Sequence, residues 1–236
     1  MKDIILYFDF DMTLGYRIMM WRDTVRELLL EEGVIIHSDE IRSFSDGKGY
    51  PWSFPLMTHE EFFAGKDWWL NTEEFIYEGL LTHTDSERAM RVSKKFRSRY
   101  INLFYWRLFP DTVSTLELLN SKGYTMNILS NHVPEAKNII EKLGISRYFD
   151  KIFISADMGV EKPNPIIYQM ALSHTTKDAL KIMIGDSYEA DIIGALNNGF
   201  DNAIMVRKPN TNKYMHYTRF FDGIDAIIEE IINENR

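Results

Sequence analysis

The sequence contains no cysteine among its 236 residues. Disulfide bonds, thiolate metal sites and cysteine nucleophiles are therefore excluded, and a reducing cytosol is the natural setting for such a chain. Long hydrophobic runs are also missing, because no stretch approaches the roughly 18 apolar residues that a membrane helix needs. The early run "IILYF" is too short for the core of a signal peptide. We therefore expect a cytoplasmic protein without a membrane segment.

Basic residues are outnumbered by acidic ones. Lysine and arginine total 27 against 35 acidic residues, and the formal net charge of −8 argues against a general affinity for nucleic acid or anionic membranes. The glycine-rich patterns G-x-G-x-x-G and G-x₄-G-K-[ST] are absent, so nucleotide cofactors have no visible cradle. The six histidines show no spacing typical of a zinc site.

Five short apolar runs are present instead. They are rich in β-branched residues and do not alternate cleanly between apolar and polar, as is typical of strands buried on both faces of a parallel sheet. They cover residues 4–10, 125–130, 151–155, 182–186 and 202–207. Helical patterns lie between or after them, at residues 110–123, 164–174 and 222–233. Strands that alternate with helices predict a doubly wound α/β core.

The stretch between the first and second strands differs from the rest of the chain. It shows helical patterns only, with the spacing of a capping box at Thr58/Glu61, Asn71/Glu74 and Thr84/Glu87. An insert of this length cannot be an ordinary connection between a strand and the next helix. We therefore predict an α/β core of residues 1–15 and 107–236 and a second, α-helical domain of residues 16–106.

Polar residues follow the predicted strands at their carboxyl ends, where ligands bind in open parallel sheets. The strands lead in turn to Asp9, Asp11 and Thr13, to Ser130 and Asn131, to Lys162, and to Asp186 and Asp191. Converging carboxylates need a cation, since two like charges about 4 Å apart repel by about 4 kcal/mol at an effective dielectric of about 20. Oxygen ligands without cysteine favour Mg²⁺.

The same set of residues is suited to phosphate. An aspartate that attacks an anionic phosphate gains from Mg²⁺ and from the charge of Lys162. Ser130 and Asn131 stand at the start of the helix after the second strand, where a hydroxyl, an amide and free backbone N–H groups can hold phosphate oxygens.

Four segments, "DFDMTL", "LSN", "EKPNP" and "GDSYEAD", resemble in order the four motifs of the haloacid dehalogenase superfamily. The resemblance covers residues 4–207, and each motif stands at a predicted strand end. It implies a Rossmann-like core with strand order 5-4-1-2-3. It also implies that residues 16–106 form a cap domain that closes over the core, excludes water and selects the substrate.

The resemblance implies catalytic roles for two aspartates. Asp9 would be the nucleophile that forms an aspartyl-phosphate, and Asp11 would act first as general acid and then as general base. The dehalogenases of the superfamily lack an acid at the second position, because a halide leaves without a proton. Asp11 therefore indicates a phosphate ester. Met12 departs from the pattern, since many members carry glycine there.

The resemblance implies that the remaining motif residues bind phosphate or metal. Thr13 would shape the loop, Ser130 would bind the phosphoryl group and Lys162 would balance its charge. The implied Mg²⁺ ligands are Asp9, Asp186 and the backbone carbonyl of Asp11, with Asp191 ordering the surroundings of the ion.

Two regions of the insert have alternative interpretations. The loop 45–61, rich in glycine, proline and aromatic residues, offers Lys48, Trp52 and His59 as candidate contacts with substrate, although it can equally pack its aromatics on the cap. The basic stretch 88–107 is either a funnel for phosphorylated substrates or a solvated helical face. We favour the solvated face.

The sequence as a whole predicts a Mg²⁺-dependent phosphatase, acting as a monomer or homodimer. The expected substrate is a small phosphorylated metabolite: a sugar phosphate, a phosphoglycolate-like acid or a nucleoside monophosphate. One alternative is a phosphomutase-type phosphotransferase with the same site, which would turn over a sugar bisphosphate without net release of phosphate. The other is a catalytically silent ligand-binding or regulatory protein, which would bind ligand without turnover.

Overall fold

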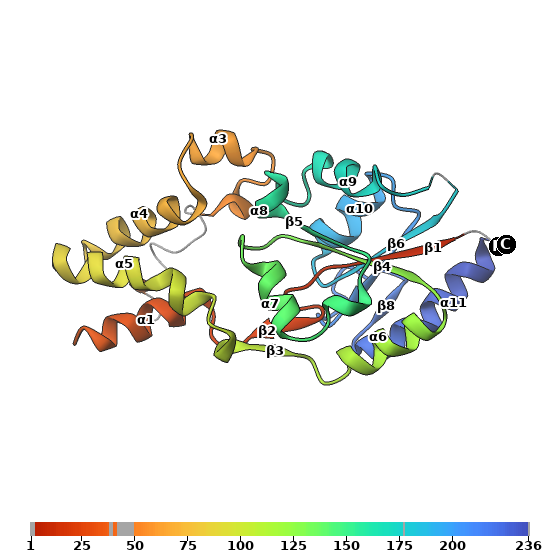
Figure 1. Ribbon diagram of the computed structural model, residues 1–236, viewed down its shortest axis with the longest axis horizontal. Helices are drawn as coiled ribbons and strands as arrows, with labels where there is room; N and C mark the ends of the chain where they lie inside the picture. The colour runs from red at the N-terminus through yellow and green to blue at the C-terminus, as the bar shows by residue number, and fades with distance from the viewer. Residues whose placement is uncertain (1–2, 38–39, 42–49, 177, 236) are drawn as a thin grey trace. The chain divides into compact units, whose positions relative to one another are not determined.

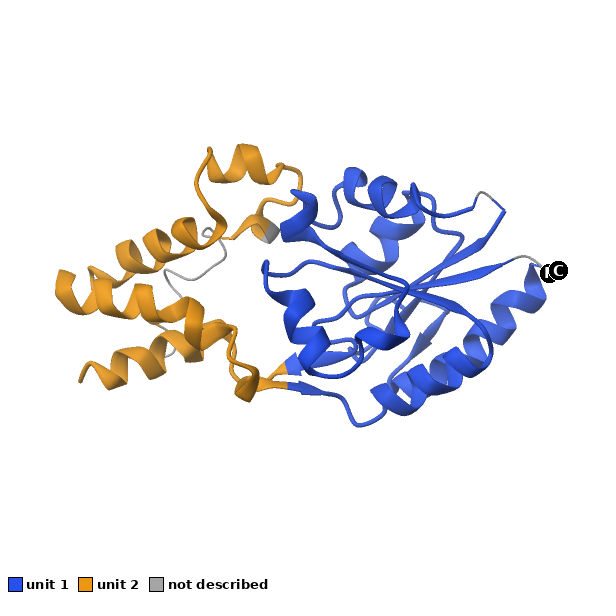
Figure 2. Ribbon diagram, viewed as in Figure 1, with its two compact units in different colours: residues 1–16, 107–236 blue, residues 17–106 orange. Residues whose placement is uncertain are grey.

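The computed structural model (Figure 1) describes residues 3–37, 40–41, 50–176 and 178–235. The chain divides into two compact units, a core unit of residues 1–16 and 107–236 and a helical unit of residues 17–106 (Figure 2). The chain passes between them through strands β2 (Gly15–Arg17) and β3 (Trp106–Leu108), which pair as a two-stranded sheet.

The core unit is built on a parallel sheet, which has six strands within the described residues, in the order β5-β4-β1-β6-β7-β8. These strands are β1 (Ile4–Phe8), β4 (Thr125–Ser130), β5 (Lys151–Ile154), β6 (Leu180–Gly185), β7 (Asn202–Val206) and β8 (Tyr217–Thr218). The five predicted strands take the predicted order, so the doubly wound α/β fold is confirmed. The two-residue strand β8 extends the edge beyond β7 and was not predicted.

Helices cover both faces of this sheet (Figure 1). The helical elements of the core unit are α6 (Thr112–Ser121), α7 (Ala136–Lys142), η3 (Ser146–Tyr148), α8 (Ser155–Met158), α9 (Pro165–Leu172), η4 (Tyr188–Ile193), α10 (Gly194–Leu196), η5 (Phe221–Gly223) and α11 (Ile224–Glu234). Tyr7 packs with Tyr168 of α9 on one face, whereas the ring of Phe8 lies 5.8 Å from that of Phe221. Adjacent residues of β1 thus serve opposite faces, which explains why its apolar run shows no alternation.

The predicted helices of the core unit are present, and their start signals act as expected. Residues 110–123 contain α6, residues 164–174 contain α9, and residues 222–233 largely coincide with α11. The side chain of Asn164 accepts a hydrogen bond from the backbone N–H of Ile166 at 3.1 Å, with Pro165 at the first helical position.

The helical unit contains α1 (Trp21–Glu31), η1 (Pro51–Ser53), α3 (His59–Phe63), α4 (Trp68–Leu80), α5 (Ser86–Tyr100) and η2 (Leu103–Tyr105). The predicted capping box is confirmed at Thr58, whose hydroxyl accepts the N–H of Glu61 while the Glu61 carboxylate accepts the N–H of Thr58. Within the part of the chain that the structure describes, every helix falls short of the length and hydrophobicity that a membrane span requires.

The other two predicted helix starts are wrong. Helix α4 begins after Asp67, whose carboxylate accepts the N–H groups of Trp69 and Leu70 at 2.9 and 3.2 Å. Helix α5 begins after Asp85, whose carboxylate accepts the N–H of Arg88 at 3.0 Å. In both cases a nearby aspartate takes the capping position, where a carboxylate also interacts favourably with the helix dipole.

Three of the six basic residues of α5 pair with acidic residues in the C-terminal half of α1 or directly after it. The pairs, at 2.6 to 3.1 Å, are Arg91 with Glu32, Lys95 with Glu32, Arg99 with Glu27 and Arg99 with Glu31. A cation that is already paired contributes little to a long-range field for substrates. This arrangement supports the interpretation of the basic stretch as a helical face and not as a funnel.

Gly194 lies where the start of α10 comes close to its neighbours. A Cβ atom at this position would lie 2.9 Å from both the Glu189 carbonyl oxygen and the Pro163 Cβ, and it would also meet the Tyr168 hydroxyl. The Tyr168 hydroxyl itself donates a hydrogen bond to the Ala190 carbonyl, so it is not free to move aside. The packing of α9 against η4 and α10 therefore depends on the absence of a side chain here.

We expect Gly194→Ala to lower the free energy of unfolding by about 1–3 kcal/mol, because an extra methyl group in a filled interior forces its neighbours apart. Urea unfolding followed by circular dichroism measures the effect. Asn120→Ala, at an exposed position of α6, is the control and should change stability by less than about 0.5 kcal/mol. Equal stabilities for the two variants would contradict the close packing at Gly194.

Candidate active site

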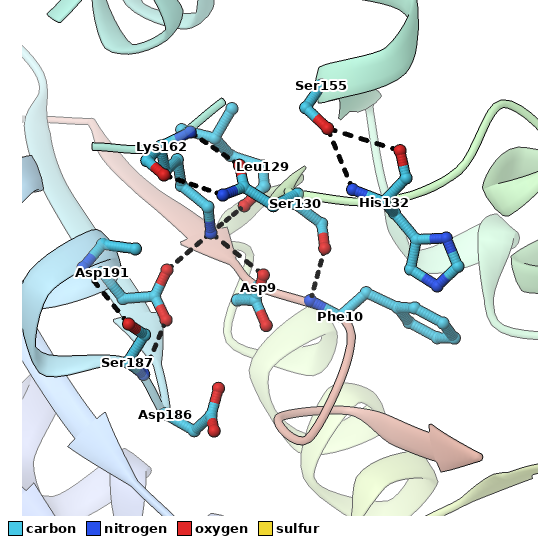
Figure 3. A network of polar contacts seen from close by, with 12 residues as sticks. Asp9, Phe10, Leu129, Ser130, His132, Ser155, Lys162, Asp186, Ser187 and Asp191 are labelled. Carbon is cyan, nitrogen blue, oxygen red and sulfur yellow. Dashed lines mark hydrogen bonds and ion pairs between the residues drawn. The ribbon is translucent and has the colours of Figure 1, made fainter. Parts of the chain in front are cut away.

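The candidate site lies at the carboxyl edge of three neighbouring strands. Strand β1 runs into Asp9, β4 ends in Ser130, and β6 runs into Asp186. Because β1 pairs with both β4 and β6, the three polar residues meet at one place. Figure 3 shows Asp9 at the centre of the group, with Asp186 and Asp191 on one side and Ser130 on the other.

A single buried ammonium group connects these residues. The Nζ atom of Lys162 donates hydrogen bonds to Asp9 Oδ1 at 2.9 Å, to Asp191 Oδ1 at 2.5 Å and to the carbonyl oxygen of Leu129 at 2.8 Å. Burial by itself would lower the pKa of Lys162, but the charges of Asp191 and Asp9 outweigh it and raise the pKa above its usual range. The lysine is therefore charged at neutral pH.

Asn131 holds this lysine in place. Its side-chain oxygen accepts the backbone N–H of Lys162 at 2.7 Å, and its side-chain nitrogen donates to the Lys162 carbonyl at 2.8 Å. The sequence predicted that the Asn131 amide holds phosphate oxygens, whereas in the structure both of its polar atoms are engaged by the backbone of Lys162.

Asp191 is buried beneath the site. One carboxylate oxygen contacts Lys162, and the other accepts the backbone N–H of Ser187 at 2.9 Å. Burial, together with Asp9 and Asp186, raises the pKa of Asp191 to about 7, against the opposing effect of Lys162. A Cβ on Gly185 would collide with the Asp191 carboxylate, so the end of β6 must be glycine for this approach.

Asp9, Asp186 and Asp191 could together hold a metal ion. Each offers a carboxylate oxygen, these oxygens all lie within 4.8 Å of one another, and the three residues are buried. Burial and the charge of Asp9 also raise the pKa of Asp186, the signature of carboxylates that lack sufficient positive charge. An all-oxygen set of this kind fits a hard divalent cation.

Asp11 sits on a tight turn that follows β1. The turn is closed by hydrogen bonds from Leu14 N–H and Gly15 N–H to the Phe10 carbonyl, both 3.0 Å, and from Met12 N–H to the Gly15 carbonyl at 2.7 Å. Burial, followed by the charges of Asp9 and Asp186, raises the pKa of Asp11 to about 7. A carboxyl group with this pKa can both give and take a proton near neutral pH.

Three further residues lie on this turn or contact it. Ser130 is fully buried, and its hydroxyl accepts the N–H of Phe10 at 3.4 Å. Thr13 is also fully buried, and within the described residues its hydroxyl makes no hydrogen bond. Met12 adopts a left-handed conformation with φ of 63°, a region that glycine enters more readily than residues with a side chain.

Sequence reasoning missed one charged residue of the site. The Nζ atom of Lys208 lies 2.5 Å from Asp186 Oδ2, so a second cation neutralises the cluster from the side of β7. The signal was present, because Lys208 follows the fifth predicted strand at its carboxyl end, as the other site residues follow theirs.

The structure describes the side chain of one of the three candidates from the insert. His59 is buried at the start of α3 with its ring 5.3 Å from that of Phe63, which fits the alternative of packing within the helical unit. Lys48 lies outside the described residues. Trp52 belongs to η1, and its side chain lies outside the described part of the chain.

Residues 6–199 match the family profile described as haloacid dehalogenase-like hydrolase. The chain belongs to this family. The four motifs of the family therefore coincide with the residues that the fold gathers around Asp9.

Individual relatives of this haloacid dehalogenase-like hydrolase perform different chemistries. The chain is 34% identical over 131 residues to the glyceraldehyde 3-phosphate phosphatase of Methanothermobacter thermautotrophicus, a match that covers 54% of this chain and 57% of that protein. It is 29% identical over 167 residues to (S)-2-haloacid dehalogenase 4A of Burkholderia cepacia, covering 70% of this chain and 68% of that protein. The chain thus spans little more than half the length of the first relative.

Solved structures share the fold at low sequence identity. The HAD-hydrolase YfnB of Bacillus subtilis, whose crystal structure is bound to magnesium, has a TM-score of 0.72 to this chain at 17% identity. The superposition covers 97% of this chain and 100% of that one. This similarity shows that both parts of the chain follow a known architecture of the family.

We expect Lys162→Ala to lower the free energy of unfolding by about 3–5 kcal/mol, because it leaves Asp9 and Asp191 buried without their common cation. Urea unfolding in the presence of EDTA measures the loss. Adding Asp191→Asn to the variant should restore part of it, since one of the unpaired charges is then removed.

The matched control is Lys181→Ala. Lys181 pairs with Asp201 at 3.0 Å, but Asp201 is 41% exposed, so we expect a loss below about 1 kcal/mol. A loss for Lys162→Ala as small as that of the control would show that the buried ammonium does not hold the site together.

Proposed function

We propose that this haloacid dehalogenase-like hydrolase is a Mg²⁺-dependent phosphatase that cleaves a small phosphate monoester through an aspartyl-phosphate on Asp9. The observation that carries the proposal is Asp11, a second carboxyl group two residues after Asp9, on the tight turn that follows β1. A departing alkoxide needs a proton and a departing halide does not. A proton donor at this position therefore favours the phosphatases of the family over its dehalogenases.

The reaction has two proposed steps. In the first, a carboxylate oxygen of Asp9 attacks phosphorus, the bond from phosphorus to the ester oxygen breaks, and that oxygen takes the proton of Asp11. In the second, the Asp11 carboxylate takes a proton from water, the water oxygen attacks phosphorus, and the bond to Asp9 breaks. The products are the free alcohol and inorganic phosphate, and both aspartates return to their starting states.

Positive groups around Asp9 would hold the phosphoryl oxygens. The ammonium of Lys162 already contacts Asp9 at 2.9 Å, and it would balance the negative charge that develops during transfer. The Ser130 hydroxyl would donate a hydrogen bond to a phosphoryl oxygen. Since Asn131 fixes the backbone of Lys162, its contribution would be to keep the ammonium in position.

Asp9, Asp186 and the backbone carbonyl of Asp11 would hold Mg²⁺, while Asp191 would order this arrangement through Lys162. The bound ion supplies positive charge that offsets the repulsion between the carboxylates and an incoming phosphate. The Asp186 carboxylate pairs with Lys208. This second lysine therefore balances the charge of Asp186 from the end of β7.

The substrate is proposed to be a small phosphorylated metabolite such as a sugar phosphate, a phosphoglycolate-like acid or a nucleoside monophosphate. The helical unit, inserted directly after the turn that carries Asp11, would act as the cap that selects among them. The relatives named phosphatases support the class of reaction, and the arrangement of acidic groups at the strand ends supports the mechanism.

We expect purified protein to release inorganic phosphate from at least one ester in a panel of these classes, with Mg²⁺ and not with EDTA. Asp9→Asn should abolish release, because an amide cannot form the phosphoenzyme. Asp11→Asn should lower kcat by about 10²–10⁴-fold, the usual contribution of a general acid or base. Asp201→Asn, which alters an exposed carboxylate, is the control. Undiminished activity in Asp9→Asn would overturn the nucleophile assignment.

We expect Mg²⁺ to raise the melting temperature of the wild-type protein. At about 100 times Kd the gain is about 2.7 kcal/mol, which corresponds to roughly 5–10 °C for a chain of this size. Asp186→Asn should abolish the shift, whereas Asp225→Asn, which pairs with Lys122 on the surface, should retain it. A full shift in Asp186→Asn would show that the ion binds elsewhere.

A further inference from the structure

A bidentate ion pair lies beside the carboxylate cluster without belonging to any of the four motifs. The two terminal nitrogens of Arg207 donate to the two carboxylate oxygens of Asp111 at 2.9 and 2.7 Å, and both side chains are largely buried. Burial alone would raise the pKa of Asp111, but Arg207 outweighs it and holds the pKa below its usual range. The Asp111 carboxylate is therefore charged at neutral pH.

The third nitrogen of this guanidinium contacts the turn that carries Asp11. The Nε atom of Arg207 donates to the carbonyl oxygen of Thr13 at 3.1 Å. The next carbonyl along the chain, that of Leu14, accepts the hydroxyl of Thr112 at 2.7 Å. Asp111 and Thr112 are adjacent at the start of α6. Arg207 and Thr112 therefore hydrogen-bond to two successive carbonyls of the turn.

Two aromatic rings also lie against the guanidinium of Arg207. Its central carbon lies 4.0 Å from the ring centre of Phe109 and 5.3 Å from that of Phe221. The backbone N–H of Phe221 also donates to Asp111 at 2.9 Å. Arg207 thus joins the turn after β1, the start of α6, the end of β7 and the segment before α11.

The backbone of Arg207 is itself unusual. Among the described residues, those other than glycine with a positive φ are Met12, Ala64, Arg207 and Lys213. Met12, with φ of 63°, and Arg207, with φ of 69°, both line the same cavity of about 550 Å³. Such conformations persist only where the surroundings determine them, and they cluster at functional sites.

We propose that Arg207, oriented by Asp111, is a positioning residue that holds the turn after β1 so that the Asp11 carboxyl reaches the leaving oxygen. The inference rests on the proposed function, since it assumes that Asp11 is the proton donor. Arg207 itself touches no reacting atom, and it acts through the Thr13 carbonyl, two residues from Asp11. A displacement of the turn by about 1 Å would suffice to impair proton transfer.

This role makes a specific demand on the leaving group. An alkyl phosphate releases a strongly basic alkoxide and depends on the proton of Asp11. A 4-nitrophenyl phosphate releases a weakly basic phenolate and depends on that proton much less. A misplaced Asp11 therefore slows formation of the phosphoenzyme selectively for the alkyl ester. This step is measured by kcat/KM, because hydrolysis of the phosphoenzyme, in which Asp11 acts as base, is common to both esters and contributes only to kcat. A loss of folded protein slows both esters by the same factor, so the ratio of the two rates is independent of the folded fraction.

The test is the ratio of kcat/KM values for an alkyl phosphate and 4-nitrophenyl phosphate in Arg207→Gln, and all variants are compared by this ratio. We expect kcat/KM for the alkyl ester to fall about 10- to 100-fold, with kcat/KM for the nitrophenyl ester close to that of the wild type. Arg207→Lys should recover only part of the loss, because an ammonium cannot make the bidentate contact and reach Thr13 together. Equal losses for both esters would overturn the inference.

Two further variants complete the design. Asp111→Asn should show the same selective loss to a smaller degree, and it carries the test if Arg207→Gln does not fold. Arg147→Gln is the matched control, because its guanidinium also lies over an aromatic ring, that of Tyr148 at 4.8 Å, and near a carboxylate, that of Glu117 at 3.9 Å. The wild-type ratio should be unchanged in this control.

Asp11→Asn distinguishes a failure of the positioning role of Arg207 from a failure of the proposed function. A selective loss for the alkyl ester in Asp11→Asn, without one in Arg207→Gln or Asp111→Asn, would refute the positioning role and leave the proposed function standing. Equal losses for both esters in Asp11→Asn would refute the role of Asp11 as proton donor, and with it the inference that depends on it.

Discussion

The buried ammonium of Lys162 is the interaction on which this site depends. It lies between Asp9 and Asp191 and also satisfies a backbone carbonyl at the end of β4, so one charge stabilises two acidic side chains, one that follows β1 and one in η4. Carboxylates removed from water are costly unless they are paired and hydrogen-bonded. The raised pKa values of Asp11 and Asp191 show that the compensation is partial. A site that is short of positive charge is prepared to receive a divalent cation.

The topology and the main site residues were predictable from the sequence because both follow from short-range rules. A strand buried on both faces leaves a continuous apolar run, and a parallel sheet gathers the residues after its strands at one edge. Asp9, Ser130 and Asp186 are far apart in the chain, yet the pairing of β1 with β4 and β6 brings them together. Helix starts were less predictable, since Asp67 and Asp85 compete for the capping position with neighbours that also match the pattern.

What the sequence did not reveal depends on contacts whose partners have no recognisable spacing. Lys208 and Arg207 adjoin after β7, and their position at a strand end does not show which partner either side chain contacts. Only the fold shows that one side chain turns to Asp186 and the other to Asp111. Asn131 was recognised as a residue of the site, but the partner of its amide is the backbone of Lys162, which no local pattern encodes.

The pairing of β2 with β3 has a consequence for how such chains diversify. The polypeptide leaves the core unit at Gly15–Arg17 and returns at Trp106–Leu108, and these segments are hydrogen-bonded neighbours. The two ends of the insert are therefore adjacent, as are the ends of a hairpin loop, whatever the number of residues between them. A helical unit of another length or sequence can therefore replace residues 17–106 without any change in the strand order of the core unit.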